Sequence, residues 1–66
     1  MNDEELLQKV KIAIGETSDY QDELLKIYID EVKQYMLDAG VSEEKVNSSK
    51  ALGTIARGVM DLWDYG

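Results

Sequence analysis

The sequence predicts an all-α fold: a small bundle of three main helices with one short helical turn. Proline is absent from the 66 residues, so helices can run without interruption. Apolar residues recur at helical spacing in three long segments, and β-branched residues never alternate with polar ones as they do in strands. The expected helices cover about 3–14, 19–39 and 49–64, with the turn near 42–46.

The first segment carries a helix-start signal at one end and a helix-stop signal at the other. Asn2 with Glu5 three residues later forms a capping box, and Gly15 suits the left-handed position that ends many helices. At about 100° per residue, one face of this helix collects Leu6, Leu7, Val10, Ala13 and Ile14.

The second helix is predicted from a broad apolar arc of roughly 140°. A second capping box, Ser18 with Gln21, begins it, and Gly40 ends it. Asp22 and Lys26 stand four residues apart in the order that favours an ion pair. The arc contains Leu24, Leu25, Tyr28, Ile29, Val32, Tyr35, Met36 and Ala39.

Capping signals also place the turn and the last helix. Ser42 caps the turn, and Ser48 or Asn47 caps the last helix. Gly53 and Gly58 each cost about 1 kcal/mol relative to alanine inside a helix, and close helix–helix approach is the expected reason for both. The expected common core consists of Leu24, Tyr28, Val32, Tyr35, Met36, Ile55, Val59 and Trp63.

Composition excludes several functions. Fourteen acidic against seven basic residues give a net charge of −7, which disfavours binding to nucleic acid or to anionic membranes. Cysteine and histidine are absent, so disulfides, a structural zinc site, a thiol nucleophile and an imidazole base are excluded. No apolar run reaches the length of a membrane span, and the acidic N-terminus is unlike a secretory signal. We expect a non-enzymatic protein without cofactor, made in the cytoplasm.

The acidic clusters do not predict a metal site. Asp19, Asp22 and Glu23 fall at the start of one predicted helix, where they point along its outside. Calcium requires oxygen ligands curled around a tight loop, so capping and solvated surface account for these carboxylates.

Several strings, taken in order, resemble a known family. These are Ile14-Gly15, the acidic helix start from Asp19 to Glu23, the helix end Ala39-Gly40-Val41, and a last helix through Val59-Met60-Asp61-Leu62-Trp63. In this order and spacing the chain resembles, over nearly its whole length, the N-terminal half of phage head–tail connector proteins. These are also described as DNA-packaging or head-completion proteins of tailed phages and prophages.

The resemblance implies a structural role in the virion. Copies of such proteins form a ring below the portal, contact portal and tail-completion proteins, and leave a channel through which DNA passes without sequence-specific binding. It also implies assembly in the bacterial host cytoplasm and a final place at the head–tail neck. Residues 1–66 are then one connector-like domain. Since family members usually continue further, we expect either a C-terminally truncated domain or a short relative.

An alternative from another class is a small acidic regulator that binds one protein, such as an antitoxin, an anti-repressor or a DNA-mimic inhibitor. A ring protein needs two different lateral surfaces, whereas a regulator needs one exposed patch. Apolar residues off the three core faces, together with the aromatic end of the chain, are the candidate interface, unless Ile12 and Ile27 simply widen the core. The candidates are Ile12, Ile27, Leu37, Trp63 and Tyr65.

Overall fold

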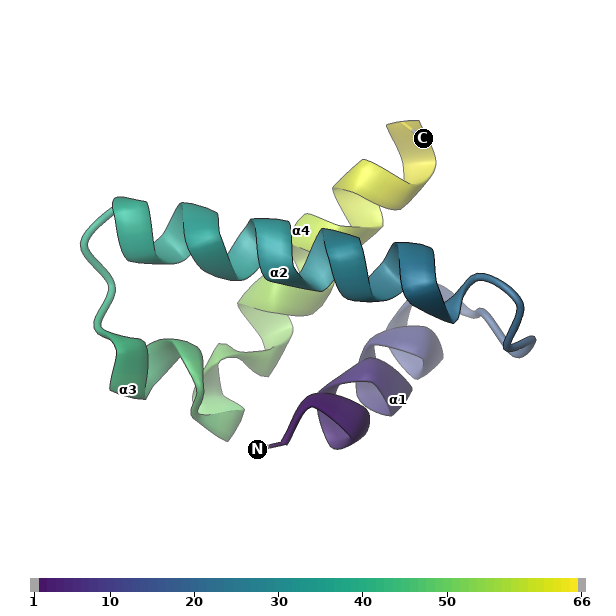
Figure 1. Ribbon diagram of the computed structural model, residues 1–66, viewed down its shortest axis with the longest axis horizontal. Helices are drawn as coiled ribbons and strands as arrows, with labels where there is room; N and C mark the ends of the chain where they lie inside the picture. The colour runs from purple at the N-terminus through teal and green to yellow at the C-terminus, as the bar shows by residue number, and fades with distance from the viewer. Residues whose placement is uncertain (1, 66) are drawn as a thin grey trace.

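The computed structural model describes residues 2–65, and within them four α-helices and one 3₁₀ helix follow one another with no strand (Figure 1). The all-α fold predicted from the sequence is confirmed. In chain order the elements are α1 (Asp3–Ile14), α2 (Asp22–Asp38), α3 (Glu43–Val46), η1 (Ser49–Ala51) and α4 (Leu52–Tyr65).

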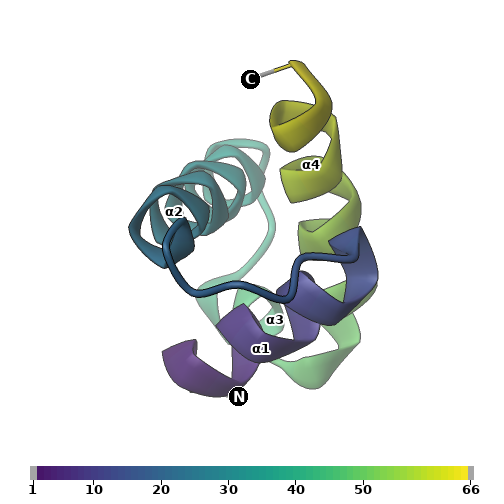
Figure 2. The same cartoon turned by 90° about the vertical axis from the view of Figure 1, so that its right-hand side faces the viewer.

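The three long helices do not run alongside one another as in an up-and-down bundle. The two views show α2 lying across α4, while α1 packs against the lower part of the molecule beside α4 (Figures 1 and 2). The short α3 and η1 connect the far end of α2 back to α4. A crossing helix covers only part of its neighbour, which leaves apolar surface open on both.

Both ends of α1 are as predicted. The side chain of Asn2 accepts a hydrogen bond from the backbone N–H of Glu5 at 2.7 Å, which satisfies one of the unpaired donors at a helix start. Gly15 ends the helix with φ 78°, a left-handed conformation that favours glycine.

α2 begins at Asp22, so the predicted start at residue 19 is wrong. Ser18, the predicted cap, donates its hydroxyl and its backbone N–H to Oε1 of Glu16, at 2.9 and 3.0 Å. Its side chain is therefore engaged upstream, and Gln21, which precedes the helix, makes no side-chain capping bond. The predicted end is correct to within one residue, and Gly40 follows it with φ 95°.

The predicted turn and last helix are present with one difference at the caps. The Ser42 side chain accepts the backbone N–H of Lys45 and so caps α3, as expected. Ser48 stands at the start of η1 but donates its hydroxyl to the backbone oxygen of Lys45 at 2.8 Å instead of capping, and Asn47 ends α3. The last helix therefore opens with the 3₁₀ turn η1 before α4.

The core lies where α1, α2 and α4 meet. Its buried members are Leu6, Leu7, Val10, Leu25, Ile29, Ala51, Ile55, Ala56 and Val59. Of the predicted core residues, Ile55 and Val59 are buried, and four more pack against this cluster while partly exposed: Tyr28, Val32, Met36 and Trp63.

Two residues assigned to the core from the sequence are on the surface. Leu24 is 39% exposed and Tyr35 is 75% exposed. Both lie at the edge of the apolar arc of α2, and the crossing helix α4 does not extend over them.

α2 and α4 approach most closely at a glycine. A Cβ atom on Gly58 would lie 2.9 Å from both Cγ atoms of Val32, so only glycine allows this approach, as predicted. The same expectation is wrong for Gly53, where a Cβ atom would have no neighbour within 4 Å.

Candidate protein interface

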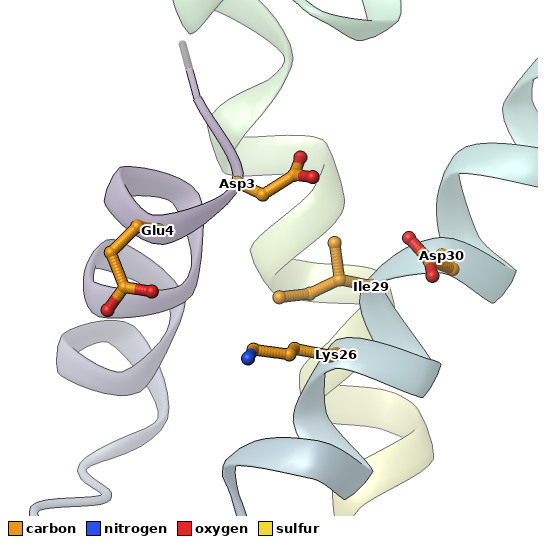
Figure 3. A pocket seen from close by; sticks show the side chains of 5 residues that line it. All are labelled: Asp3, Glu4, Lys26, Ile29 and Asp30. Carbon is orange, nitrogen blue, oxygen red and sulfur yellow. The ribbon is translucent and has the colours of Figure 1, made fainter.

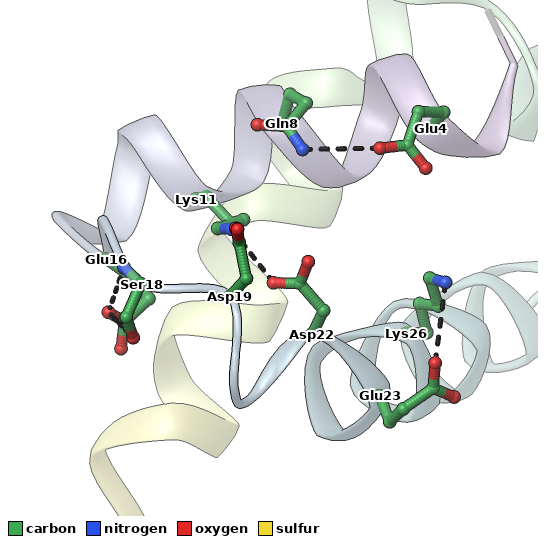
Figure 4. Close-up of polar contacts among 9 residues, drawn as sticks. All are labelled: Glu4, Gln8, Lys11, Glu16, Ser18, Asp19, Asp22, Glu23 and Lys26. Carbon is green, nitrogen blue, oxygen red and sulfur yellow. Dashed lines mark hydrogen bonds and ion pairs between the residues drawn. The ribbon is translucent and has the colours of Figure 1, made fainter.

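One charged side chain is buried among the described residues, that of Lys11 on α1. Its Nζ donates a hydrogen bond to Oδ1 of Asp19 at 2.7 Å and lies 2.9 Å from Oδ1 of Asp22 (Figure 4). That Asp22 oxygen is buried and makes no aligned hydrogen bond within residues 2–65, so the nearby ammonium charge compensates it. Lys11 thereby links α1 to the connecting loop through Asp19 and to the first turn of α2 through Asp22.

This cluster corrects two predictions. Asp22 was expected to form an ion pair with Lys26, but Nζ of Lys26 lies 3.6 Å from Oε1 of Glu23 instead. Asp19 and Asp22 were expected on the outside of one continuous helix, yet both bind the ammonium of Lys11. The physical reason is burial. The Lys11 ammonium is withdrawn from water and requires anionic partners, whereas the half-exposed Lys26 ammonium stays hydrated and requires none.

Lys11 and Asp19 shift each other's pKa in opposite directions. The hydrogen bond to Asp19, followed by the contact with Asp22, raises the pKa of Lys11 despite its burial. The same hydrogen bond lowers the pKa of Asp19. Both groups are therefore charged at neutral pH, and the arrangement is suited to fixing the loop and not to transferring protons.

A hollow of about 210 Å³, lined mainly by charged residues, lies between α1 and α2 (Figure 3). Its lining residues are Asp3, Glu4, Lys26, Ile29 and Asp30. Its three carboxylates point in different directions, and Oδ1 of Asp3 lies 3.4 Å from Nζ of Lys33. Within residues 2–65 no group of three or more His, Cys, Asp or Glu residues is arranged to hold a metal ion.

The predicted interface residues whose side chains the structure describes fall into two groups. Ile12 on α1 is 80% exposed, and on α2 Ile27 is 61% and Leu37 is 36% exposed, so none of them widens the core. Trp63 is partly buried and packs against the core. The side chain of Tyr65 lies outside the described part of the chain.

The structure adds apolar surface residues that the sequence did not assign to an interface. Leu24 and Tyr35 join Ile27 on one side of α2, since their helical positions fall within about 80° of one another. Tyr20, in the preceding loop, is 82% exposed. The signal in the sequence that could have indicated these surface residues is the width of the apolar arc of α2, which exceeds what one crossing helix covers.

An apolar groove runs between α2 and α4. It encloses about 280 Å³ and is open to solvent. Val32 and Tyr35 form its wall on α2, and Leu62 and Gly58 form its wall on α4. It exists because Gly58 lets the two helices touch at one point, from which they diverge.

Acidic residues flank this groove on both helices. Glu31 lines it from α2 and Asp61 from α4. Among residues 2–65 no cation lies within ion-pair distance of either carboxylate. The groove therefore combines an apolar floor with uncompensated negative charge.

Compared with protein-family models, curated proteins and solved structures, the chain gives no match. None of the helices in the described part of the chain is both long enough and apolar enough to cross a membrane.

Proposed function

We propose that this chain is a structural, non-enzymatic assembly protein of the phage head–tail connector kind. Copies form a ring below the portal, contact portal and tail-completion proteins, and leave a channel for DNA at the neck of the virion. The proposal begins from the resemblance in the order of its motifs. It is supported by helix ends at Gly15 and near Gly40, where that resemblance implies them.

The observation that carries the proposal is that exposed apolar residues occupy two separate helices. Ile12 projects from α1, while Ile27 and Leu37 are exposed on α2. A closed ring formed head to tail requires two different lateral surfaces on each copy. The charge of −7 is compatible with a channel, because an acidic wall repels the phosphates of a passing duplex.

The test is the double substitution Ile27→Ser with Leu37→Ser in the phage protein. Both side chains are exposed, so the isolated domain should keep its melting temperature while connector assembly on portal-bearing heads and plaque formation fall. The matched control is Asp30→Ser with Gln34→Ser, two exposed polar positions on the same helix. Unchanged assembly, or an equal loss in the control, refutes the interface; a loss of domain stability also refutes it.

One observation favours a second candidate, a small acidic regulator such as an antitoxin, an anti-repressor or a DNA-mimic inhibitor. An apolar groove flanked by Glu31 and Asp61 is the kind of patch that such a protein needs. The gene neighbourhood separates the two candidates, because portal and capsid genes upstream favour the connector and a toxin or repressor gene beside it favours the regulator.

A further inference from the structure

We infer that the groove between α2 and α4 binds a basic amphipathic helix of another protein. This inference goes beyond the connector role and does not depend on it. It rests on the shape of the groove, on the exposed apolar residues beside it and on its charge.

The groove is shaped for side chains from a partner. Its walls are Val32 and Tyr35 on one helix and Leu62 on the other, and it is open to solvent. Its volume of about 280 Å³ lies just below the range of roughly 300–1,000 Å³ that is usual for enclosed small-molecule sites. An open apolar groove between two helices is the geometry in which a third helix places its apolar anchors.

Exposed apolar residues extend the surface beyond the groove. Tyr35 is 75% exposed, and Ile27 and Leu24, on the same side of α2, are 61% and 39% exposed. Tyrosine offers a large, rigid contact area with a polar tip, and it is enriched among residues that dominate binding energy. Leu24 and Tyr35 are eleven residues apart, roughly 16 Å along the helix, so these apolar residues can follow more than one turn of a partner helix, with Glu31 between them on the same side.

The negative charge beside the groove indicates a positively charged partner. Glu31 and Asp61 flank the groove from opposite helices and have no cation within ion-pair distance in residues 2–65. Lys or Arg residues beside the apolar anchors of a partner would compensate them, and this charge complementarity would also speed association.

A second copy of this chain fits less well. Two copies that meet through the same groove would bring their Glu31 and Asp61 carboxylates together, which is repulsive. Of the remaining surface, the face with Lys50 and Arg57 offers positive charge beside Gly53 and Thr54 but no large apolar anchor. The exposed Ile12 on α1 is an apolar anchor, but the nearby Lys9 is already paired with Glu5. The occupant is therefore a different protein.

The probes are two synthetic amphipathic helices of the same pattern, one of leucine and lysine and the other of leucine and glutamate. Binding is followed by the amide NMR shifts of the whole chain at low salt. We expect the lysine peptide to bind and to shift residues around Val32, Gly58 and Leu62, and we expect the glutamate peptide not to bind. Equal binding of both peptides, or shifts confined to other surfaces, overturns the inference.

Charge reversal provides the matched comparison. Glu31→Lys with Asp61→Lys should weaken the binding of the lysine peptide about tenfold, as expected for the loss of two exposed ion pairs. Glu4→Lys with Glu44→Lys changes the net charge equally at exposed sites outside the groove, and it should weaken binding about threefold or less. An equal loss in both variants reveals general attraction to an acidic protein and overturns the inference.

A last variant tests the apolar contact and the alternative occupant. Tyr35→Ala should weaken the lysine peptide at least about fivefold without lowering the melting temperature, because the side chain is mostly exposed. Sedimentation should show the chain alone as a monomer. Self-association that Tyr35→Ala abolishes would assign the groove to a second copy and refute the inference.

Discussion

Gly58→Ala is the sharpest test of how α2 and α4 pack. Alanine is favoured over glycine inside a helix by about 1 kcal/mol, so propensity alone predicts stabilisation. The new Cβ, however, would lie 2.9 Å from both Cγ atoms of Val32, about 0.6 Å inside the ~3.5 Å at which carbon atoms normally touch. Val32 has one preferred χ1 rotamer in a helix and cannot turn aside. Since overpacking costs about 1–3 kcal/mol, we expect a net loss of about 1 kcal/mol.

Gly53→Ala is the matched control on the same helix. A Cβ at this position meets nothing within 4 Å, so only the propensity gain of about 0.5–1 kcal/mol remains. The difference between the two variants therefore isolates the overlap with Val32. Gly58→Ala combined with Val32→Ala removes the obstruction, and in that background the Gly58 substitution should become stabilising.

The assay is urea unfolding followed by circular dichroism, together with thermal melting. In a domain of this size 1 kcal/mol corresponds to about 4–8 °C, and the two variants should differ by about 1.5–2 kcal/mol, so Gly53→Ala should melt at least about 6 °C above Gly58→Ala. If both variants are stabilised equally, α2 and α4 do not touch at Gly58, and the crossing described above is incorrect.

Three further predictions concern the charge cluster, the core and the first cap. The pKa of Asp19 is lowered and that of Lys11 is raised in the folded state, so the cluster should lose its contribution to stability as the pH falls below about 4 or rises above about 10. Lys11→Met should flatten both losses relative to the original chain in urea unfolding across pH; parallel profiles would contradict this. Val32→Asp places a carboxylate against α4 beside Asp61 and should cost more than about 2 kcal/mol in urea unfolding. Asn2→Ala should cost about 1 kcal/mol by the same measurement and Asn2→Asp almost nothing, since an aspartate can still accept the N–H of Glu5.

The local features of the fold were predictable because local chemistry decides them. Asn2 and Ser42 accept backbone N–H groups a few residues away, and Gly15 and Gly40 adopt positive φ where two helices end. Each of these signals needs only neighbouring residues. The existence and order of the helices followed from them and from the spacing of apolar residues.

The start of α2 was not predictable in this way because a long-range interaction decides it. Ser18 and Gln21 form an acceptable local capping box, but the side chain of Ser18 binds Glu16, and Asp19 binds Lys11 on another helix. A signal for this was present, since Lys11 lies four residues after the buried Leu7 and hence on the core face of α1. A buried cation at such a position requires anionic partners, and the nearest acidic cluster supplies them.

The candidate interface follows from the same crossing that stabilises the core. An apolar arc on a helix is equally suited to burial and to binding, so the sequence alone could not separate Leu24 and Tyr35 from Tyr28 and Val32. The distinction arises only in three dimensions, because Gly58 lets α4 cross α2 at Val32 instead of running along it. A helix aligned with α2 would cover Tyr35 and leave no groove. The contact at Gly58 therefore buries the centre of the arc and leaves its edge for a partner.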